Sequence, residues 1–431
     1  MRKILFIIPY IPYPLNSGGN QAFFNMVDYI RQKYSVSLLL YPRSKSQKSN
    51  VQSLKKIWSN VDFFIFEPDG SKKQHSLYYK WLKKIQDSVT RKIRRLKARD
   101  NQYRGSDIVH EKSVLSRSMF ERLDSTYVEY VAKVSRLGFD IIQVEFYDLI
   151  SLGYLLPENV QTVFVHHELM YIRIEKEMSL FQEVTEEERM LSRLAKDYER
   201  NALLSYKHVI ALTEIDRSLL IEFLGRREQT YNSPAVVKIA EDSETRFVTV
   251  KNNRLTFVGS KAHFPNLDAV VWFCREIAPC LRRRGFHFTF QVVGQWNGSS
   301  VKQMQSTCPE LELVGYVEQL HSFLNGSIFL VPIRIGSGMR MKILDGVFAK
   351  SPFITTSKGV EGIDLRNGEE CLVADDAEDF ADAIIRLAGD EVLQEKLACQ
   401  ANARLRELYE PKKMLEQRLA VYDQILEYKN K

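Results

Sequence analysis

The chain has 431 residues, of which 45% are hydrophobic and 27% charged, with 20 Gly and 13 Pro. These values are ordinary for a globular protein and exclude the collagen-like and disordered classes. Because one hydrophobic core seldom serves so long a chain, we expect two domains of roughly 200 residues each.

The formal net charge of +7 is unevenly distributed. Lys72–Arg104 holds twelve Lys and Arg against Asp87 and Asp100, so this segment carries +10 and the rest of the chain −3. Its apolar residues recur at helical spacing, which predicts a basic amphipathic helix within about 70–105. Such a helix can lie on an anionic membrane surface, or be a solvated insertion that packs on its own domain. We expect no nucleic-acid partner, because the segment has no recognised binding motif.

Neither a membrane span nor a disulfide framework is indicated. The apolar stretch Ile4–Leu15 is interrupted by prolines and is shorter than the roughly 20 residues that a span needs, and no signal-peptide cleavage site follows it. The five cysteines are odd in number and form no CxxC pair, so neither disulfides nor a zinc site is expected. We therefore expect a cytoplasmic protein.

The first half, residues 1–245, is predicted to form one α/β domain. The apolar run Lys3–Ile8 has the length of a buried strand, ends at a Pro- and Gly-rich turn, and precedes a helical pattern that extends to Ile30. Five further runs of strand length follow, at Val36–Tyr41, Val61–Phe66, Asp140–Val144, Val160–Val165 and His208–Leu212. Helical segments separate most of them, which is typical of a parallel sheet.

The second half, residues 250–410, shows the same alternation after a polar linker at Glu241–Asn253. The predicted strands are Arg254–Gly259, Phe288–Val293, Leu311–Val314, Ile328–Ile333, Phe353–Thr356 and Leu372–Ala374. An amphipathic helix is predicted at 411–431, beginning at Pro411. In two doubly wound sheets, ligands bind outside the carboxyl ends of the strands.

The strongest pattern lies at Val331–Asp345, where a buried strand runs through a glycine turn into a helix. Gly336 and Gly338 allow the backbone to approach a phosphate closely, and the first N–H groups of a helix attract anions. Arg340 and Lys342 add positive charge. The bare pattern is equally consistent with a tight turn that carries solvated basic side chains.

Together with the residues up to Gly359-Val-Glu361-Gly362, this stretch resembles the nucleotide-sugar-binding core of retaining glycosyltransferase family 4, in the branch with a Gly-Ser-Gly-x-Arg-x-Lys turn. Phe257-Val-Gly-Ser260 resembles the opening strand of the family's donor domain. The resemblance implies the GT-B fold: two doubly wound, Rossmann-like parallel-sheet domains that face a central cleft, with the C-terminal helix crossing back to the N-terminal domain.

The resemblance also implies roles in binding a nucleotide-diphosphate sugar. Asp345 matches the acidic position that holds the donor's ribose hydroxyls, where the family more often has Glu. Ser337 stands where the family's paired-glutamate motif has its first Glu. Ser260 and Asn266 stand where the family commonly has an Arg and a Lys that neutralise the leaving diphosphate. The candidates to neutralise it in this chain are then four other basic residues, namely Arg340, Lys342, Arg334 and Lys261.

Three further sites are candidates. Gly18-Gly19 follows the first strand and resembles the family's glycine pair at the donor phosphate and acceptor, although a plain turn explains it equally well. His166 and His167 end a buried strand. Since side chains alternate along a strand, we expect one of the two to face the cleft. His166 best matches the family's histidine that contacts the transferred sugar. Glu361 is expected either to contact the donor or to cap a helix.

The expected function is transfer of a sugar, with retention, to a glycan or lipid-linked acceptor in cell-surface polysaccharide or glycoconjugate biosynthesis. No side chain is an obvious nucleophile, which suits a front-face route in which the leaving phosphate takes the acceptor's proton. The resemblance implies no metal and no other cofactor. The basic segment would hold the enzyme on the inner face of the plasma membrane.

Two alternatives to this function are considered. A nucleotide-sugar epimerase has the same two-domain shape but needs additional carboxylates in the cleft. A non-catalytic GT-B scaffold would keep the fold and dock on a membrane or a partner enzyme through Lys72–Arg104.

Overall fold

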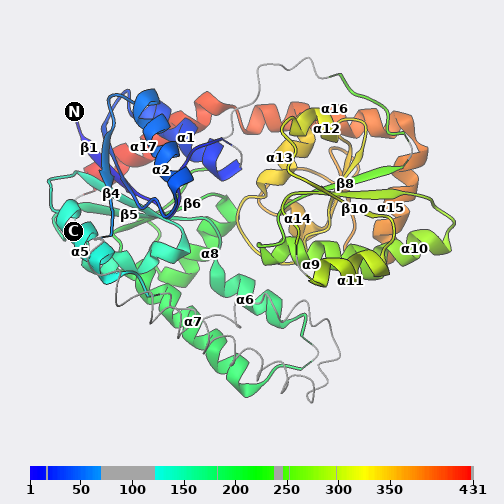
Figure 1. Ribbon diagram of the computed structural model, residues 1–431, viewed down its shortest axis with the longest axis horizontal. Helices are drawn as coiled ribbons and strands as arrows, with labels where there is room; N and C mark the ends of the chain where they lie inside the picture. The colour runs from blue at the N-terminus through cyan, green and yellow to red at the C-terminus, as the bar shows by residue number, and fades with distance from the viewer. Residues whose placement is uncertain are drawn as a thin grey trace.

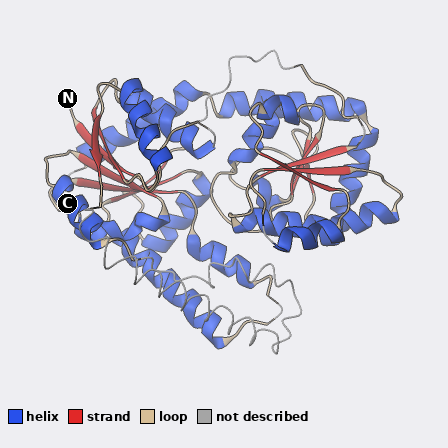
Figure 2. Ribbon diagram, in the orientation of Figure 1, coloured by secondary structure: helices blue, strands red, loops and turns tan. Residues whose placement is uncertain are grey.

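The computed structural model describes residues 1–15, 18–68, 122–181, 183–236, 246–251, 253–297 and 299–428. Two α/β domains, each built on its own sheet, lie side by side (Figures 1 and 2). The basic amphipathic helix predicted within about 70–105 falls outside the described residues.

The N-terminal domain contains a seven-stranded sheet with the strand order β3-β2-β1-β4-β5-β6-β7, and every neighbouring pair is parallel. The strands are β1 (Lys3–Ile7), β2 (Ser35–Leu40), β3 (Asp62–Ile65), β4 (Ile141–Glu145), β5 (Gln161–His166), β6 (His208–Ala211) and β7 (Thr230–Asn232). The order reverses at β1, which lies between β2 and β4. In doubly wound sheets the ligand crevice opens at such a reversal.

Both faces of this sheet are buried, as a continuous apolar strand predicts. Ile4 and Phe6 of β1 pack into one hydrophobic cluster, while Leu5 and Ile7 pack into another on the opposite face. The helices of this domain are α1 (Gly18–Ile30), α2 (Lys45–Ile57), α5 (Ser125–Ser135), the 3₁₀ helix η3 (Tyr147–Leu155), α6 (Met170–Met178), α7 (Glu186–Leu204) and α8 (Glu214–Leu224).

The C-terminal domain contains a six-stranded parallel sheet with the order β10-β9-β8-β11-β12-β13. Its strands are β8 (Arg254–Val258), β9 (Thr289–Val293), β10 (Leu311–Gly315), β11 (Ile328–Val331), β12 (Phe353–Thr355) and β13 (Leu372–Val373). Its helices are α9 (Phe264–Trp272), the π-helical turn η4 (Phe273–Ile277), α10 (Ala278–Arg283), α11 (Ser299–Thr307), α12 (Leu320–Leu324), α13 (Met341–Phe348), α14 (Ser357–Val360), α15 (Ala377–Gly389) and α16 (Glu391–Leu408).

The predicted fold is confirmed, since both doubly wound parallel sheets are present and every predicted strand has its counterpart. One strand, β7 (Thr230–Asn232), is not among those predicted from the sequence. It has three residues and pairs with β6 at the edge of the sheet. A strand this short has no alternating or continuous apolar run by which it could be recognised.

The helix α17 (Pro411–Glu427) returns to the N-terminal domain, where it lies beside α1 (Figure 1). The buried guanidinium of Arg418 donates to the hydroxyl of Ser233 at 2.7 Å and to the Ser233 carbonyl at 3.0 Å. The hydroxyl of Tyr34 donates to the carboxylate of Asp423 at 2.9 Å. The helix that follows the second domain thus forms part of the first.

We expect Arg418→Ala to lower the free energy of unfolding by about 2–3 kcal/mol, because it removes charged hydrogen bonds and leaves buried partners unsatisfied. Urea unfolding followed by circular dichroism measures the change. The control is Lys413→Ala on the same helix, whose side chain is exposed and whose loss should change stability by less than about 0.5 kcal/mol. Equal stability of the two variants would contradict the role given to Arg418.

Candidate active site

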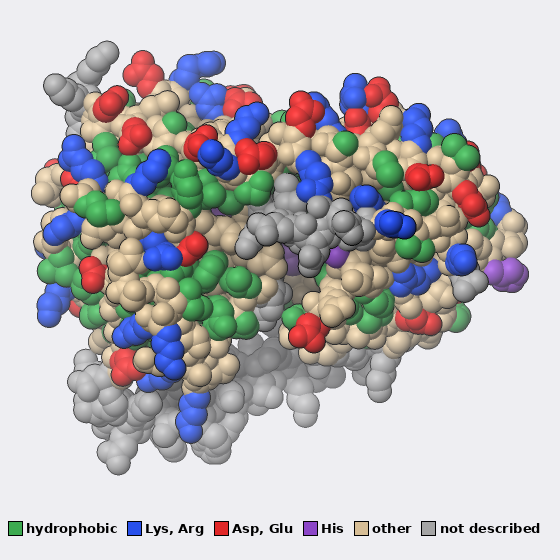
Figure 3. All heavy atoms as spheres, turned by 90° about the horizontal axis from the view of Figure 1, so that it is seen from above, with side chains coloured by type: hydrophobic (Ala, Val, Ile, Leu, Met, Phe, Trp, Pro, Cys, Tyr) green, Lys and Arg blue, Asp and Glu red, His purple; other side chains and the backbone are tan. Residues whose placement is uncertain are grey.

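A cavity of about 980 Å³ lies between the two domains and is lined by residues of both. From the N-terminal domain it receives side chains that follow β1, β4 and β5, and from the C-terminal domain the residues after β8 and β11. Figure 3 shows histidine side chains at this junction, whereas Lys, Arg, Asp and Glu are interspersed over the surrounding surface. The cavity therefore lies where doubly wound sheets bind ligands.

The segment between β11 and α13 forms a turn that we call the glycine loop, residues 336–340. Gly336 and Gly338 have φ angles of 102° and 82°, a region that residues with a Cβ rarely adopt. A Cβ on Gly338 would lie 2.1 Å from the carbonyl oxygen of His167, and one on Gly336 would lie 2.9 Å from Glu168 Oε1. The loop thus requires glycine both for its backbone conformation and for its close approach to the N-terminal domain.

Hydrogen bonds from two backbone amides join the glycine loop to the N-terminal domain. The amide of Gly338 donates to Asp216 Oδ2 at 3.1 Å, and the amide of Leu169 donates to the hydroxyl of Ser337 at 2.6 Å. The pKa of Asp216 is raised by burial. The hydrogen bonds from Thr213 and Gly338 lower the pKa, but by less than burial raises it. The described conformation is therefore a closed one, in which a buried carboxylate of one domain holds the backbone of the other.

Arg340 is the buried cation of the glycine loop. Its Nη1 donates to the carbonyls of Ser337 and Gly338, the latter at 2.7 Å, whereas its buried Nη2 has no hydrogen-bond partner among the described residues. Burial lowers the pKa of Arg340, while the carboxylates of Glu168, Glu361 and Asp216 raise it. A buried guanidinium with an unused donor is suited to bind an anion.

Lys342 lies on the first turn of α13, close to Arg340. Its ammonium donates to Asn266 Oδ1 and lies 4.4 Å from the centroid of the Phe257 ring. Burial, together with the charge of Arg340, lowers the pKa of Lys342 to about 7. An anion bound in the cavity would therefore stabilise the charged form of Lys342.

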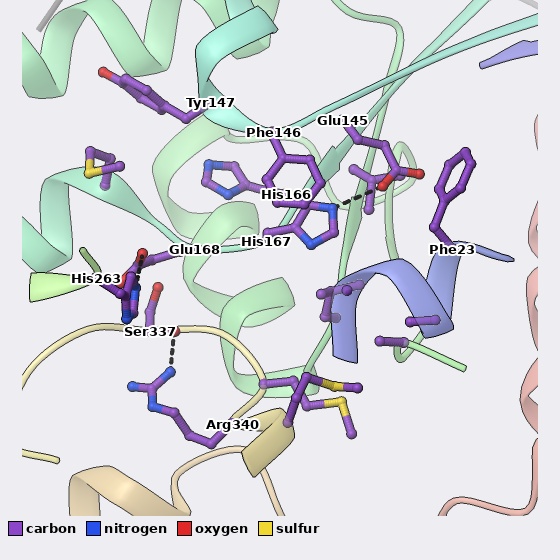
Figure 4. Close-up of a pocket in the computed structure, with 18 of the residues that line it drawn as sticks. Phe23, Glu145, Phe146, Tyr147, His166, His167, Glu168, His263, Ser337 and Arg340 are labelled. Carbon is purple, nitrogen blue, oxygen red and sulfur yellow. Dashed lines mark hydrogen bonds and ion pairs between the residues drawn. The ribbon is translucent and has the colours of Figure 1, made fainter. Parts of the chain in front are cut away.

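Glu168 links the two domains through charge. Its carboxylate accepts from Arg173 Nη1 at 3.1 Å and lies 3.5 Å from Nε2 of His263 in the C-terminal domain (Figure 4). Burial raises the pKa of Glu168, but the positive charges of Arg173, His263 and Arg340 outweigh this effect and lower it to about 2. A carboxylate of the N-terminal domain therefore lies against the glycine loop and its cation.

The two adjacent histidines have different surroundings, although both line the cavity. His166 is buried, and its Nε2 lies 2.8 Å from Glu199, which also accepts from the first two amides of α6. The side chain of His167 is 27% exposed, against 2% for His166, and its Nε2 lies 3.0 Å from Glu145. Figure 4 shows the His167 ring between Glu145 and the glycine loop.

The structure thus gathers some of the predicted site residues at the cavity and not others. Six of the predicted residues line it: Gly19, His166, Asn266, Ser337, Arg340 and Lys342. Gly336 and Gly338 form the loop beside it, and Gly18 lies against Met341 of α13. The roles of these residues stay predictions.

The other predicted residues are not part of the cavity lining. Arg334 makes a bidentate ion pair with buried Asp268, at 3.1 and 2.6 Å. Lys261 donates to the carbonyl of Asn297 at 2.9 Å, and Asn266 donates to the Ser260 carbonyl at 3.0 Å. Asp345 lies 3.8 Å from His321, and Glu361 pairs with Lys358 at 2.6 Å. Arg340 and Lys342 are therefore the two predicted cations that reach the cavity.

Several residues of the site were not singled out from the sequence. Glu145 is the last residue of β4 and Phe146 follows it, while Asp216 lies in the first turn of α8 after β6. The rule that ligands lie at the carboxyl ends of strands points to these positions, but it does not say which side chain turns inward. Among the described residues, no three His, Cys, Asp or Glu are grouped as a metal ion would require.

Comparisons with known proteins fit this geometry. Residues 252–390 match the family model described as glycosyl transferases group 1, which covers most of the C-terminal domain. A protein of Klebsiella pneumoniae, described as an uncharacterized 44.6 kDa protein in the cps region, is 23% identical over 171 residues. That match spans 38% of this chain and 44% of the length of the Klebsiella protein.

Solved structures show the same fold over nearly the whole chain. TarM of S. aureus, in complex with fondaparinux, alpha-GlcNAc-glycerol and UDP, superposes with a TM-score of 0.67 at 11% identity, covering 99% of this chain and 100% of TarM. HepE of Anabaena, in complex with UDP and glucose, gives 0.63 at 12% identity, covering 98% and 100%. The GT-B fold is confirmed, and residues 252–390 are similar to the glycosyl transferases group 1.

Gly338→Ala should open the cleft, because its Cβ would meet the His167 carbonyl in the other domain. We expect a larger radius of gyration in small-angle X-ray scattering and a lower melting temperature. The matched control is Gly368→Ala: Gly368 has a φ of 78°, but nothing lies within 4 Å of its Cβ position. Gly368→Ala should lower the free energy of unfolding only by the backbone strain, about 1 kcal/mol. A Gly338→Ala protein as compact as this control would refute the interdomain contact.

Proposed function

We propose that the protein transfers a sugar from a nucleotide-diphosphate sugar to a glycan or lipid-linked acceptor. The observation that carries this proposal is the buried guanidinium of Arg340, whose Nη2 is unpartnered among the described residues and lies beside a glycine loop at the domain junction. Stabilising the departing diphosphate is the main electrostatic requirement of such a reaction. Arg340 and Lys342 would supply the charge that Ser260 and Asn266 do not.

The comparisons support the donor class and the pathway. The TarM and HepE structures were both determined with UDP, and the Klebsiella relative is described as a protein of the cps region. We therefore propose a UDP-sugar or related donor and a role in polysaccharide or glycoconjugate biosynthesis. The resemblance to family 4 implies transfer with retention. The anomeric coupling of the product, measured by NMR, tests this part of the proposal.

The membrane location remains part of this proposal. Among the described residues, no helix is both long and apolar enough to span a bilayer. Peripheral binding through Lys72–Arg104 would bring the cleft to a lipid-linked acceptor. The alternative of a non-catalytic scaffold predicts that no nucleotide sugar binds.

A thermal-shift screen against UDP, GDP, TDP and their sugars tests the donor site. One nucleotide series should stabilise the protein, by about 2.7 kcal/mol at a hundredfold excess over its dissociation constant. Arg340→Ala should weaken that binding by about 10- to 100-fold, because it removes a charge-assisted hydrogen bond. Arg334→Ala is the control, since Arg334 is paired with Asp268 away from the cavity lining. No response to any nucleotide would favour the scaffold.

Lys342 should make donor binding depend on pH. With a pKa of about 7, its ammonium is charged below that pH and largely neutral above it. A bound diphosphate favours the charged form and raises the pKa, so at pH 8 binding should take up close to one proton, and affinity should fall as pH rises from 7 to 9. Calorimetry in buffers of different ionisation enthalpy measures the uptake. Lys342→Arg should bind with no uptake, and absence of uptake in the wild type would contradict the proposed contact.

A further inference from the structure

Glu168 places a negative charge among three basic side chains, Arg173, His263 and Arg340, which we call the basic cluster. Its Oε2 accepts from Arg173 Nη1 at 3.1 Å and lies 3.5 Å from Nε2 of His263. Figure 4 shows Glu168 and His263 side by side, next to Ser337 of the glycine loop. The carboxylate is ionised, because the basic cluster lowers its pKa to about 2. The basic cluster therefore already contains an anion of the protein itself.

The other oxygen of Glu168 borders a space beside Arg340. Gly336 has no side chain, and the position that its Cβ would take is 2.9 Å from Glu168 Oε1 and 3.4 Å from Arg340 Nη2. Nη2 is buried and has no hydrogen-bond partner among the described residues. A diphosphate oxygen in this space could accept from Nη2, but it would lie next to the carboxylate. Because two negatively charged oxygens at such a distance repel each other, the ligand and Glu168 exclude one another.

The partners of Glu168 can lose it without leaving a buried charge unpaired. Arg173 also donates from Nε to the buried carboxylate of Glu177 at 2.9 Å, so its charge stays compensated when Glu168 moves away. The side chain of His263 is 51% exposed, so water can solvate it. A large cost arises when a buried ion loses its only partner, and neither residue is in that situation. The Glu168 carboxylate is thus bound to cations but can be displaced from them.

We propose that Glu168 is an internal competitor of the donor: its carboxylate occupies the basic cluster until the donor's diphosphate displaces it. This inference rests on the proposed function and assigns to that site a residue that opposes binding. The apparent affinity for the ligand is lowered by the fraction of protein in which Glu168 holds the site. After transfer, the same carboxylate competes with the nucleoside diphosphate and so favours release of this product.

Inorganic pyrophosphate is the probe for this competition, because it carries the charge of a diphosphate without a base or a sugar. Glu168→Gln keeps the volume of the side chain but removes its charge, so pyrophosphate should bind about three- to tenfold more tightly than to the wild type. Isothermal titration calorimetry at one pH and ionic strength measures both dissociation constants. The nucleoside diphosphate that responds in the nucleotide screen should show the same change.

The sign of the change decides the proposal. Equal affinity of Glu168→Gln and the wild type would mean that Glu168 does not compete with the ligand. Weaker binding by Glu168→Gln would mean that Glu168 positions Arg340 for the ligand. Either result would overturn the inference.

Glu177→Gln is the matched control. It removes the same charge from the same arginine, but Glu177 does not line the cavity. Its affinity for pyrophosphate should stay within about twofold of the wild type, because the effect of a charge falls with distance. Equal tightening by both variants would assign the effect to net charge and contradict the role of Glu168. Melting temperatures close to that of the wild type establish that both variants are folded.

Glu168→Ala separates the charge of the side chain from its volume. If the charge competes, Glu168→Ala and Glu168→Gln should bind pyrophosphate equally tightly. Tightening by Glu168→Ala alone would show that the side chain obstructs the site by its volume, and would refute competition between charges. If none of the proteins binds pyrophosphate, this inference fails, and the nucleotide screen decides whether the proposed function fails with it. The two failures are therefore distinguishable.

Discussion

The cavity depends on one contact between the domains: the glycine loop after β11 lies directly against the end of β5. Gly338 approaches the carbonyl of His167 so closely that no Cβ fits, and its amide is held by Asp216. Arg340 is buried beside the cavity because this contact closes the cleft around it. The shifted pKa values of Arg340, Lys342 and Glu168 therefore depend on the packing of the two domains as much as on the side chains themselves.

The two domains contribute partly different groups to the cavity. The C-terminal domain supplies Arg340 and Lys342, which suit an anionic ligand, together with His263. The N-terminal domain supplies carboxylates, two histidines and aromatic rings, together with Arg173. Glu168 lies at the boundary, where its low pKa reflects the cations from both domains.

The sequence is sufficient to predict the fold because buried parallel strands form continuous apolar runs, and those of β1, β5 and β11 are recognisable without structural information. The short edge strand β7 has no such run. Arg334 and Arg340 look alike in sequence, yet only the fold shows that Asp268 of α9 binds the first and leaves the second at the cavity. Strand alternation likewise predicts that His166 and His167 differ, but their partners, Glu199 and Glu145, come from distant elements that no local pattern connects to them.

The return of α17 to the N-terminal domain has a consequence for biosynthesis. During translation the strands of the first sheet leave the ribosome long before residues 411–427, yet the side chains of Met26, Ser233 and Gln143 each bond to a residue of that helix. The contacts of α17 with the first domain can therefore form only after the second domain has been synthesised. The first domain, although synthesised first, is thus the later of the two to have all its segments available.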